Sequence, residues 1–177
     1  MKTCSFYGFI SALAGALLVL ALYFLGFHSD PAKLTAAKWI GGCGGLAIAI
    51  TVTALGVKAR RAEIPETKKF GYGSALWAGV QISAVASFLS AIFIYVYHAY
   101  INPGLSELML QDTMDKLQAK GMGGPQLDQV EKITRMMMGP APQAISALIA
   151  GFIVGFIISL IVAAVLKRPE PEGPPPV

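Results

Sequence analysis

Four long apolar stretches, separated by shorter polar connections, occupy most of this chain. They cover residues 6–27, 39–57, 79–99 and 144–166, and none of them contains Asp, Glu, Lys or Arg. At ~1.5 Å rise per residue, a helix of this length crosses a hydrocarbon core of about 30 Å. Lipid offers no partner for an unpaired backbone amide, so helices are favoured over open strands. The pattern predicts an all-α, four-helix transmembrane bundle with spans at about 6–27, 36–58, 74–101 and 142–166.

A different pattern, at about residues 104–138 between the third and fourth spans, predicts an amphipathic helical hairpin. Apolar residues recur at helical spacing in both arms, and three glycines and a proline at 121–125 supply the turn. Two pairs of opposite charge stand four residues apart and are expected to form ion pairs, Asp112 with Lys116 and Glu131 with Arg135. The apolar side of the hairpin is a candidate partner surface that consists of Leu105, Met109, Leu117, Leu127, Val130 and Met137.

The composition agrees with a membrane protein. Hydrophobic residues make up 55% of the 177 residues and charged residues 14%, against ~25% charged residues in a soluble domain. We therefore expect residues 1–166 to form a single transmembrane bundle, followed by a proline-rich tail at 167–177.

The basic residues indicate how the bundle is oriented. The connection between spans two and three carries the densest basic cluster, and further basic residues precede span one and follow span four. An even number of spans places all three groups on one side, and the positive-inside rule makes that side the cytoplasm. Both termini are then cytoplasmic, and Lys33 and Lys38 lie in a short loop on the outer side. Because topology and anionic headgroups account for the basic cluster, nucleic-acid binding is not predicted.

Small residues recur every fourth position on three spans. In lipid, such residues let helix backbones approach closely, and close packing is what holds helices together there. We predict helix–helix packing, either within one chain or between subunits, at Gly41, Gly45, Gly79, Ser83, Ser87, Gly151 and Gly155.

Polar chemistry inside the spans is sparse. Gln81 is the most polar side chain in any span and is expected to make an interhelical hydrogen bond. Span three ends in an aromatic group in which His98 is predicted to be an interfacial side chain. No span carries a carboxylate, lysine or arginine of the kind that coupled transporters use near the midplane. No catalytic constellation is recognisable, so neither enzymatic activity nor a cofactor is predicted.

Three functions are compatible with this pattern. The first is a non-enzymatic accessory or scaffold subunit that packs against other membrane proteins, or against itself, through the small residues and the hairpin. The second is a passive pore or carrier for a small neutral or hydrophobic solute, lined by Gln81, Ser83, Ser87 and the glycines of span two. The third is Cu(I) handling by thioethers. The spread of the methionines around their helices argues against it, so no metal site is predicted at Met109, Met114, Met122, Met136, Met137 or Met138.

Several short motifs resemble a known family of small bacterial four-span inner-membrane proteins that is described as a domain of unknown function. The motifs are the aromatic–glycine run at 68–73, the run at 97–103 that ends in Asn102-Pro103, and the long connection before span four. The resemblance implies a multi-pass protein of the bacterial inner membrane. It implies no activity, cofactor or site.

Overall fold

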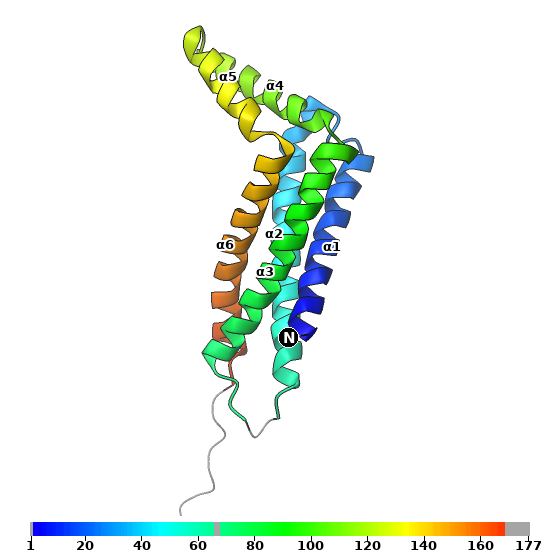
Figure 1. The fold of residues 1–177 in the computed structure, drawn as a ribbon, viewed down its shortest axis with the longest axis vertical. Coiled ribbons are helices and arrows are strands. Elements are labelled where there is room, and N and C mark those ends of the chain that lie inside the picture. The colour runs from blue at the N-terminus through cyan, green and yellow to red at the C-terminus, as the bar shows by residue number, and fades with distance from the viewer. Residues whose placement is uncertain (1, 66–67, 169–177) are drawn as a thin grey trace, which may run out of the picture.

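The computed structural model describes residues 2–65 and 68–168, and the chain is helical there apart from short connections (Figure 1). Four helices are long and apolar enough to cross a membrane: α1 (Lys2–Phe24), α2 (Pro31–Ala62), α3 (Tyr72–Val96) with its π-helical extension η1 (Tyr97–Ile101), and α6 (Pro140–Leu166). Two shorter helices form the hairpin between the third and fourth spans: α4 (Gly104–Ala119) and α5 (Pro125–Met137). The predicted all-α bundle with a helical hairpin is confirmed.

The start of α2 differs from the prediction, because the helix begins at Pro31 rather than near residue 36. The Asp30 carboxylate accepts a hydrogen bond from the Ala32 backbone N–H at 3.0 Å and so caps the helix. Pro31 suits the first helical position because it lacks the N–H that would remain unpaired there. Lys33 and Lys38, predicted to lie in a loop, therefore stand on the first two turns of α2.

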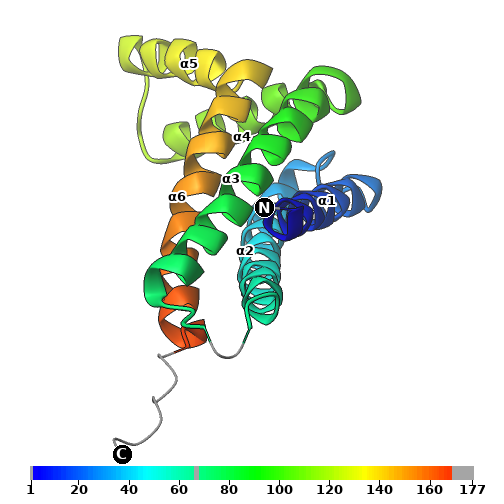
Figure 2. The same cartoon turned by 60° about the horizontal axis from the view of Figure 1, so that its bottom comes forward.

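All three chain segments that carry the basic groups lie at one end of the bundle. The start of α1, the connection from α2 to α3 and the end of α6 share this end, which we call the terminal end (Figures 1 and 2). The turn from α1 to α2 and the α4–α5 hairpin lie at the opposite end, which we call the hairpin end.

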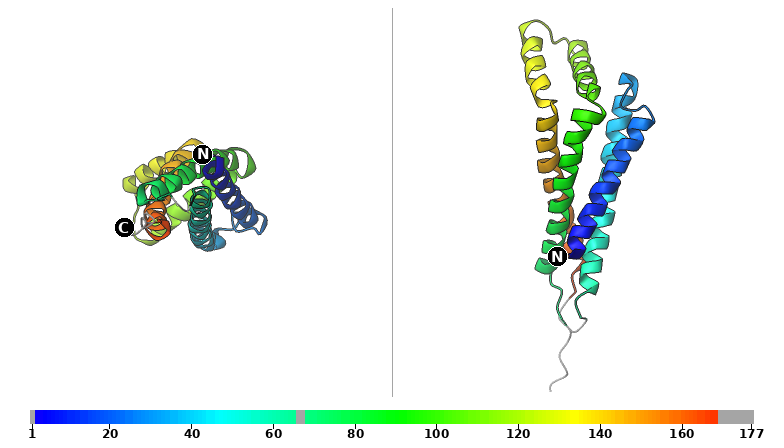
Figure 3. Two further views of the ribbon diagram at one scale, coloured as in Figure 1. Left: turned by 90° about the horizontal axis from the view of Figure 1, so that it is seen from below. Right: turned by 45° about the vertical axis from the view of Figure 1, so that its right-hand side comes forward.

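The four spans are joined through α3, which contacts α1, α2 and α6. Its most extensive contact is with α6, whereas α1 packs against both α2 and α3. Figure 3 shows that the α1–α2 pair and the α3–α6 pair lie closest at the terminal end and diverge toward the hairpin end.

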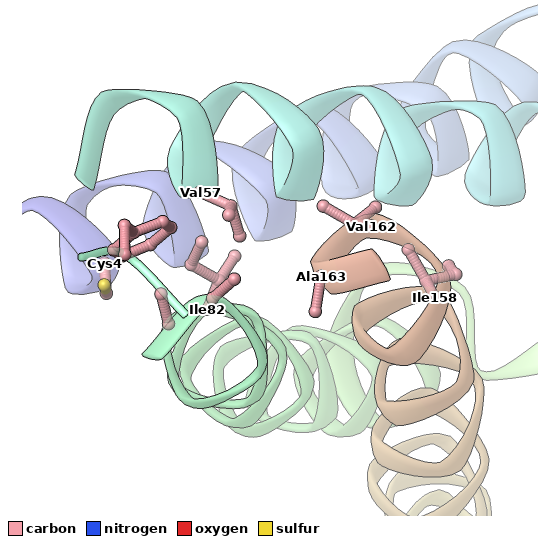
Figure 4. Close-up of a cluster of buried hydrophobic side chains, with 9 residues drawn as sticks. Cys4, Val57, Ile82, Ile158, Val162 and Ala163 are labelled. Atoms are coloured by element: carbon pink, nitrogen blue, oxygen red, sulfur yellow. The ribbon is translucent and has the colours of Figure 1, made fainter. Parts of the chain in front are cut away.

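The main hydrophobic core closes the terminal end of the bundle (Figure 4). It combines buried side chains from all four spans and from the connection before α3, namely Cys4, Val57, Phe70, Ala75, Ala78, Ile82, Ile158, Val162 and Ala163. Cys4 is only 1% exposed here, whereas Cys43 is exposed on α2, and both thiols are free.

Arg168 fastens the connection between α2 and α3 to the end of α6. Its guanidinium donates hydrogen bonds to the carbonyl groups of Ile64, Pro65 and Lys68 at 3.2, 2.8 and 3.0 Å. Its backbone N–H donates to the Phe70 carbonyl at 2.8 Å. Arg168, predicted to lie in the proline-rich tail, is thus part of the folded bundle. The rest of that predicted tail, at 169–177, lies outside the described residues.

The hairpin rests on the bundle mainly through α4. Leu105, Leu110 and Met114 of α4 are buried, whereas α5 has no buried residue. Gly121 and Gly124, with φ of +84° and +59°, form the turn between the two helices. α4 therefore supports the hairpin, and α5 is held mainly by α4.

Ion pairs fix the hairpin in place. The two predicted i,i+4 pairs are confirmed: Lys116 lies 2.8 Å from Asp112, and Arg135 lies 3.3 Å from Glu131. Arg135 also donates to both oxygens of Glu107 on α4 at 2.9 and 3.3 Å. These two carboxylates, Glu131 foremost, raise the pKa of Arg135 above its ordinary value.

A second contact ties α4 to α2. Lys38 of α2 lies 3.4 Å from the carboxylate of Asp112 on α4, which also pairs with Lys116. Burial alone would raise the pKa of Asp112, but the hydrogen bonds and positive charges of the two lysines outweigh burial and lower it. Asp112 is therefore a carboxylate at neutral pH and links the two helices.

Candidate functional site

A cavity of about 480 Å³ lies between the helices in the middle of the bundle. It has the size of a small-molecule site. All four spans contribute to its walls, with residues that are almost all small or aliphatic: Ser11, Gly15, Gly42, Gly45, Leu46, Ile48, Ala49, Thr53, Ile82, Ser83, Ala86, Ser87, Ser90, Ala147, Ala150, Gly151, Val154 and Gly155.

Missing side chains create this space. A β-carbon added at Gly15, Gly42 or Gly45 would meet no atom within 4 Å. Gly42 and Ala150, on the facing walls α2 and α6, are exposed at the surface that the four-span architecture turns toward lipid. The cavity is therefore open sideways, between α2 and α6.

The core cluster closes the cavity at the terminal end. Ile82 belongs both to the cavity wall and to this cluster. Val57 follows Thr53 by one turn of α2, and Ile158 follows Gly155 by about one turn of α6, and both side chains are buried (Figure 4). The space is consequently a pocket with one closed end.

The pocket offers hydroxyl groups but no charged side chain, among the residues that line it. The Ser87 hydroxyl donates to the Ser83 carbonyl at 2.7 Å, and the Ser159 hydroxyl donates to the Gly155 carbonyl at 2.6 Å. The Ser83 and Ser159 hydroxyl oxygens lie 3.4 Å apart. Because these hydroxyls are engaged with neighbouring groups, the wall presents a mainly apolar surface.

Most of the predicted packing residues lie in the seam between α3 and α6. A β-carbon at Gly79 would lie 2.6 Å from the Ser159 hydroxyl, and one at Gly155 would lie 2.5 Å from the Ser83 hydroxyl. Gly151 faces Ser87 in the same way at 3.2 Å. The small residues of these two spans thus pack within one chain.

The two predicted packing glycines of α2 do not behave alike. Gly41 packs against Leu22 of α1, where its added β-carbon would lie 3.6 Å from a methyl carbon. Gly45 faces the cavity, so its prediction as a packing residue is wrong. Sequence spacing pairs the two glycines, but the divergence of α2 from α6 leaves Gly45 without a neighbour.

Three glycines in close contacts were not predicted. A β-carbon would lie 2.7 Å from Val85 at Gly8, 2.8 Å from Leu18 at Gly44 and 2.5 Å from Ile82 at Gly56. Gly44 and Gly56 have no small residue four positions away, so the every-fourth-residue pattern does not detect them, whereas Gly8 has Ala12 at that spacing.

Gln81 does not belong to the cavity. It is half-buried on α3 outside the residues that line the pocket. Within residues 2–65 and 68–168 its amide makes no hydrogen bond, so the predicted interhelical bond and the predicted pore lining at this position are both wrong. Ser83, two residues further along α3, lines the pocket because two α-helical residues turn the chain by ~200°.

A second cluster, at the hairpin end, is organised around Tyr97. The Tyr97 side chain is 1% exposed, and its hydroxyl lies 2.6 Å from His28 Nδ1 and 3.3 Å from Asn102 Nδ2. The rings of Tyr23 and Phe93 pack against it with centroids 6.1 and 5.9 Å away. Burial lowers the pKa of His28, in the turn between α1 and α2. Tyr97 thus joins α3 to that turn.

His98 is buried, so its prediction as an interfacial side chain is wrong. α4 folds over it, and the Ser106 hydroxyl lies 3.2 Å from His98 Nδ1. Tyr95 and Tyr100 are exposed as an interfacial belt requires. His98 also lines a second pocket, of about 340 Å³, together with Glu107, Arg135, Met138 and neighbouring backbone.

The methionines occupy different environments. On α4, Met114 is buried and Met109 is half-buried, whereas Met136 and Met137 are exposed. Among the described residues, no group of three His, Cys, Asp or Glu side chains is placed to hold a metal ion.

Most of the candidate partner surface is turned inward. Leu105 is buried and Met109 is half-buried, and both pack around Tyr97. Leu117, Leu127 and Val130 are half-buried, while Met137 is exposed. The inward side of α4 packs against the bundle, so only one side of α5 remains exposed for a partner.

Comparison with known proteins identifies a family but no activity. A family model described as a protein of unknown function, DUF4199, matches residues 6–168. The chain therefore belongs to this family, which confirms the resemblance to an uncharacterised family. No curated protein and no solved structure matches the chain.

Proposed function

We propose that this member of the DUF4199 family is a non-enzymatic membrane protein that holds a hydrophobic molecule of the bilayer in its midplane cavity. One observation carries the proposal: the cavity is lined almost entirely by small and aliphatic residues, with no charged side chain among them, and opens sideways between α2 and α6. A ligand that enters from lipid loses no hydration, so shape and apolar contact decide its affinity.

The closed end of the cavity favours binding or carriage over a continuous pore. Ile82 and the buried side chains beyond it fill the space between the spans at the terminal end. A solute in the cavity would have to return to the bilayer or wait for the core to open. This is the geometry of a holding site rather than of a channel.

We also propose that the terminal end faces the cytoplasm of a bacterial inner membrane. The basic cluster at Lys58, Arg60, Arg61, Lys68 and Lys69 gathers at this end together with the start of α1 and the end of α6. The positive-inside rule supports this orientation.

Filling the cavity tests the proposal. Gly45→Leu adds a side chain into the open space on the α2 wall, and we expect it to displace the bound hydrophobic molecule. Native mass spectrometry of the purified protein measures the number of molecules retained. Ala47→Leu, on the exposed side of α2 outside the cavity lining, is the matched control and is expected to retain them. Equal retention by both variants would refute a function in this cavity.

A second candidate, an accessory subunit, is favoured by the exposed side of α5. Ile133, Met136 and Met137 are 59%, 70% and 61% exposed and lie within one face of the helix. Arg135 links α5 to α4 through Glu107, so this face is presented beside α4. An exposed apolar face of this kind suits a partner helix from another membrane protein.

Co-purification tests the accessory role. After gentle extraction, the wild-type protein is expected to migrate with a partner, and Met136→Asp with Met137→Asp is expected to release it. Lys132→Asp, on the neighbouring polar side of α5, is the control for added negative charge. A wild-type protein that migrates alone, or a partner that survives the double substitution, would rule this role out.

A further inference from the structure

We infer that the cavity holds one acyl tail of an anionic phospholipid whose headgroup lies at Lys38. This inference rests on the proposed function and names its ligand.

The cross-section of the cavity fits a single polymethylene chain. Its α2 wall runs from Gly42 to Thr53, which is ~16 Å along a helix. A volume of about 480 Å³ over this length gives a mean cross-section of about 30 Å². An unbranched acyl tail fits both the length of this space and its mostly small and aliphatic lining.

Lys38 stands directly above the open part of the cavity. At ~100° per residue, Lys38 and the lining residues Gly42, Gly45 and Ala49 lie within a sector of about 60° on α2. Gly42 is one helical turn from Lys38. A molecule in the cavity that extends toward the hairpin end therefore meets this ammonium group.

The height of Lys38 is that of the lipid headgroups. Lys38 and Lys58 are separated by 20 positions of α2, or about 30 Å, which is the thickness of the hydrocarbon core. The two lysines thus bracket the apolar part of the helix. The tail would point toward the core cluster at the terminal end, and its headgroup would stay at the hairpin end.

The charge around Lys38 favours an anionic headgroup. Lys38 and Lys116 share the single carboxylate of Asp112, at 3.4 and 2.8 Å. Both lysine side chains are about half exposed, whereas the Asp112 side chain is 11% exposed. The group therefore presents ammonium donors outward, and lysine binds phosphate as a point charge.

Native mass spectrometry with defined lipids tests the inference on the full chain. Phosphatidylglycerol and phosphatidylcholine with identical tails are added to the delipidated protein. We expect one phosphatidylglycerol to bind more tightly than phosphatidylcholine, and Lys38→Gln to weaken that preference about five-fold. Lys33→Gln is the matched control, because Lys33 is an exposed α2 lysine about 140° away from Lys38. It is expected to leave the preference unchanged.

The outcomes separate this inference from the proposed function. Gly45→Leu, and Ala150→Leu on the facing wall, are expected to abolish binding of both lipids, while Ala47→Leu retains it. If the wild-type protein instead retains a compound without an acyl chain, such as a compact ring compound, and the filled variants lose it, the inference is overturned and the proposed function stands. A headgroup preference that is absent, or unchanged by Lys38→Gln, would also overturn the inference. Lipid binding that survives both filled variants would overturn both.

Discussion

Replacing Gly155 by alanine is expected to force α3 and α6 apart. The new β-carbon would lie 2.5 Å from the Ser83 hydroxyl and 2.6 Å from the Ser83 β-carbon, which no side-chain rotation can move away, so the helices themselves must move. Overpacking of this kind costs about 1–3 kcal/mol of unfolding free energy. Ser83 and Ser159 would also lose their approach across the seam. Among glycine-to-alanine substitutions in the cavity wall, we expect Gly155→Ala to cause the largest loss of unfolding free energy.

The buried thiol of Cys4 provides the measurement. A thiol-reactive fluorophore labels Cys4 only when the terminal core opens, provided that the exposed Cys43 is first replaced by serine. Gly155→Ala should lower the temperature of labelling by several degrees. Gly15→Ala is the control, because its β-carbon meets nothing within 4 Å. Equal melting of the two variants would show that the seam does not hold the bundle together.

Replacing Tyr97 by alanine is expected to detach the turn between α1 and α2 from the rest of the hairpin end. The substitution removes the ring that packs against Tyr23 and Phe93, and it leaves His28 without its 2.6 Å partner. Loss of a buried aromatic side chain costs about 3–5 kcal/mol. Tyr97→Phe keeps the ring and removes only the hydroxyl, for about 1–3 kcal/mol.

Hydrogen exchange locates the damage. In Tyr97→Ala, the backbone amides of residues 25–30 and of the start of α4 should exchange faster, while the core at the terminal end stays protected. Tyr100→Ala removes a similar ring from a position that is 75% exposed and should leave exchange unchanged. Unaltered exchange in Tyr97→Ala would mean that the ion pair between Lys38 and Asp112 is sufficient to hold this end.

The sequence predicts the spans well because charge is costly in lipid and each span is a long run without charge. The α3–α6 seam is equally visible, since Gly79, Ser83, Gly151 and Gly155 form matching stripes. The cavity is not visible in this way. Gly41 and Gly45 stand four residues apart, like a packing pair. Gly45 faces empty space only because α2 diverges from α6.

Polar positions were harder to predict for a related reason. Gln81 is the most polar side chain of the spans, yet the pocket begins one residue later, at Ile82. His98 lies at the end of an apolar span, where an exposed belt residue is common, and only the fold of α4 covers it. The environment of both side chains depends on how the helix is rotated about its axis relative to its neighbours, and that rotation cannot be read from the sequence of the helix alone.

The length of α2 has a consequence for how the molecule sits in bilayers of different thickness. α2 has 32 residues and is about 48 Å long, of which the apolar part between Lys38 and Lys58 spans about 30 Å. A bilayer thinner than this apolar part increases the tilt of α2, at a cost of fractions of a kcal/mol per Å of mismatch. Because Lys38 is tied to Asp112, a tilt of α2 pulls on α4, and Arg135 passes this movement to α5. The inclination of α5 then follows the local thickness of the membrane.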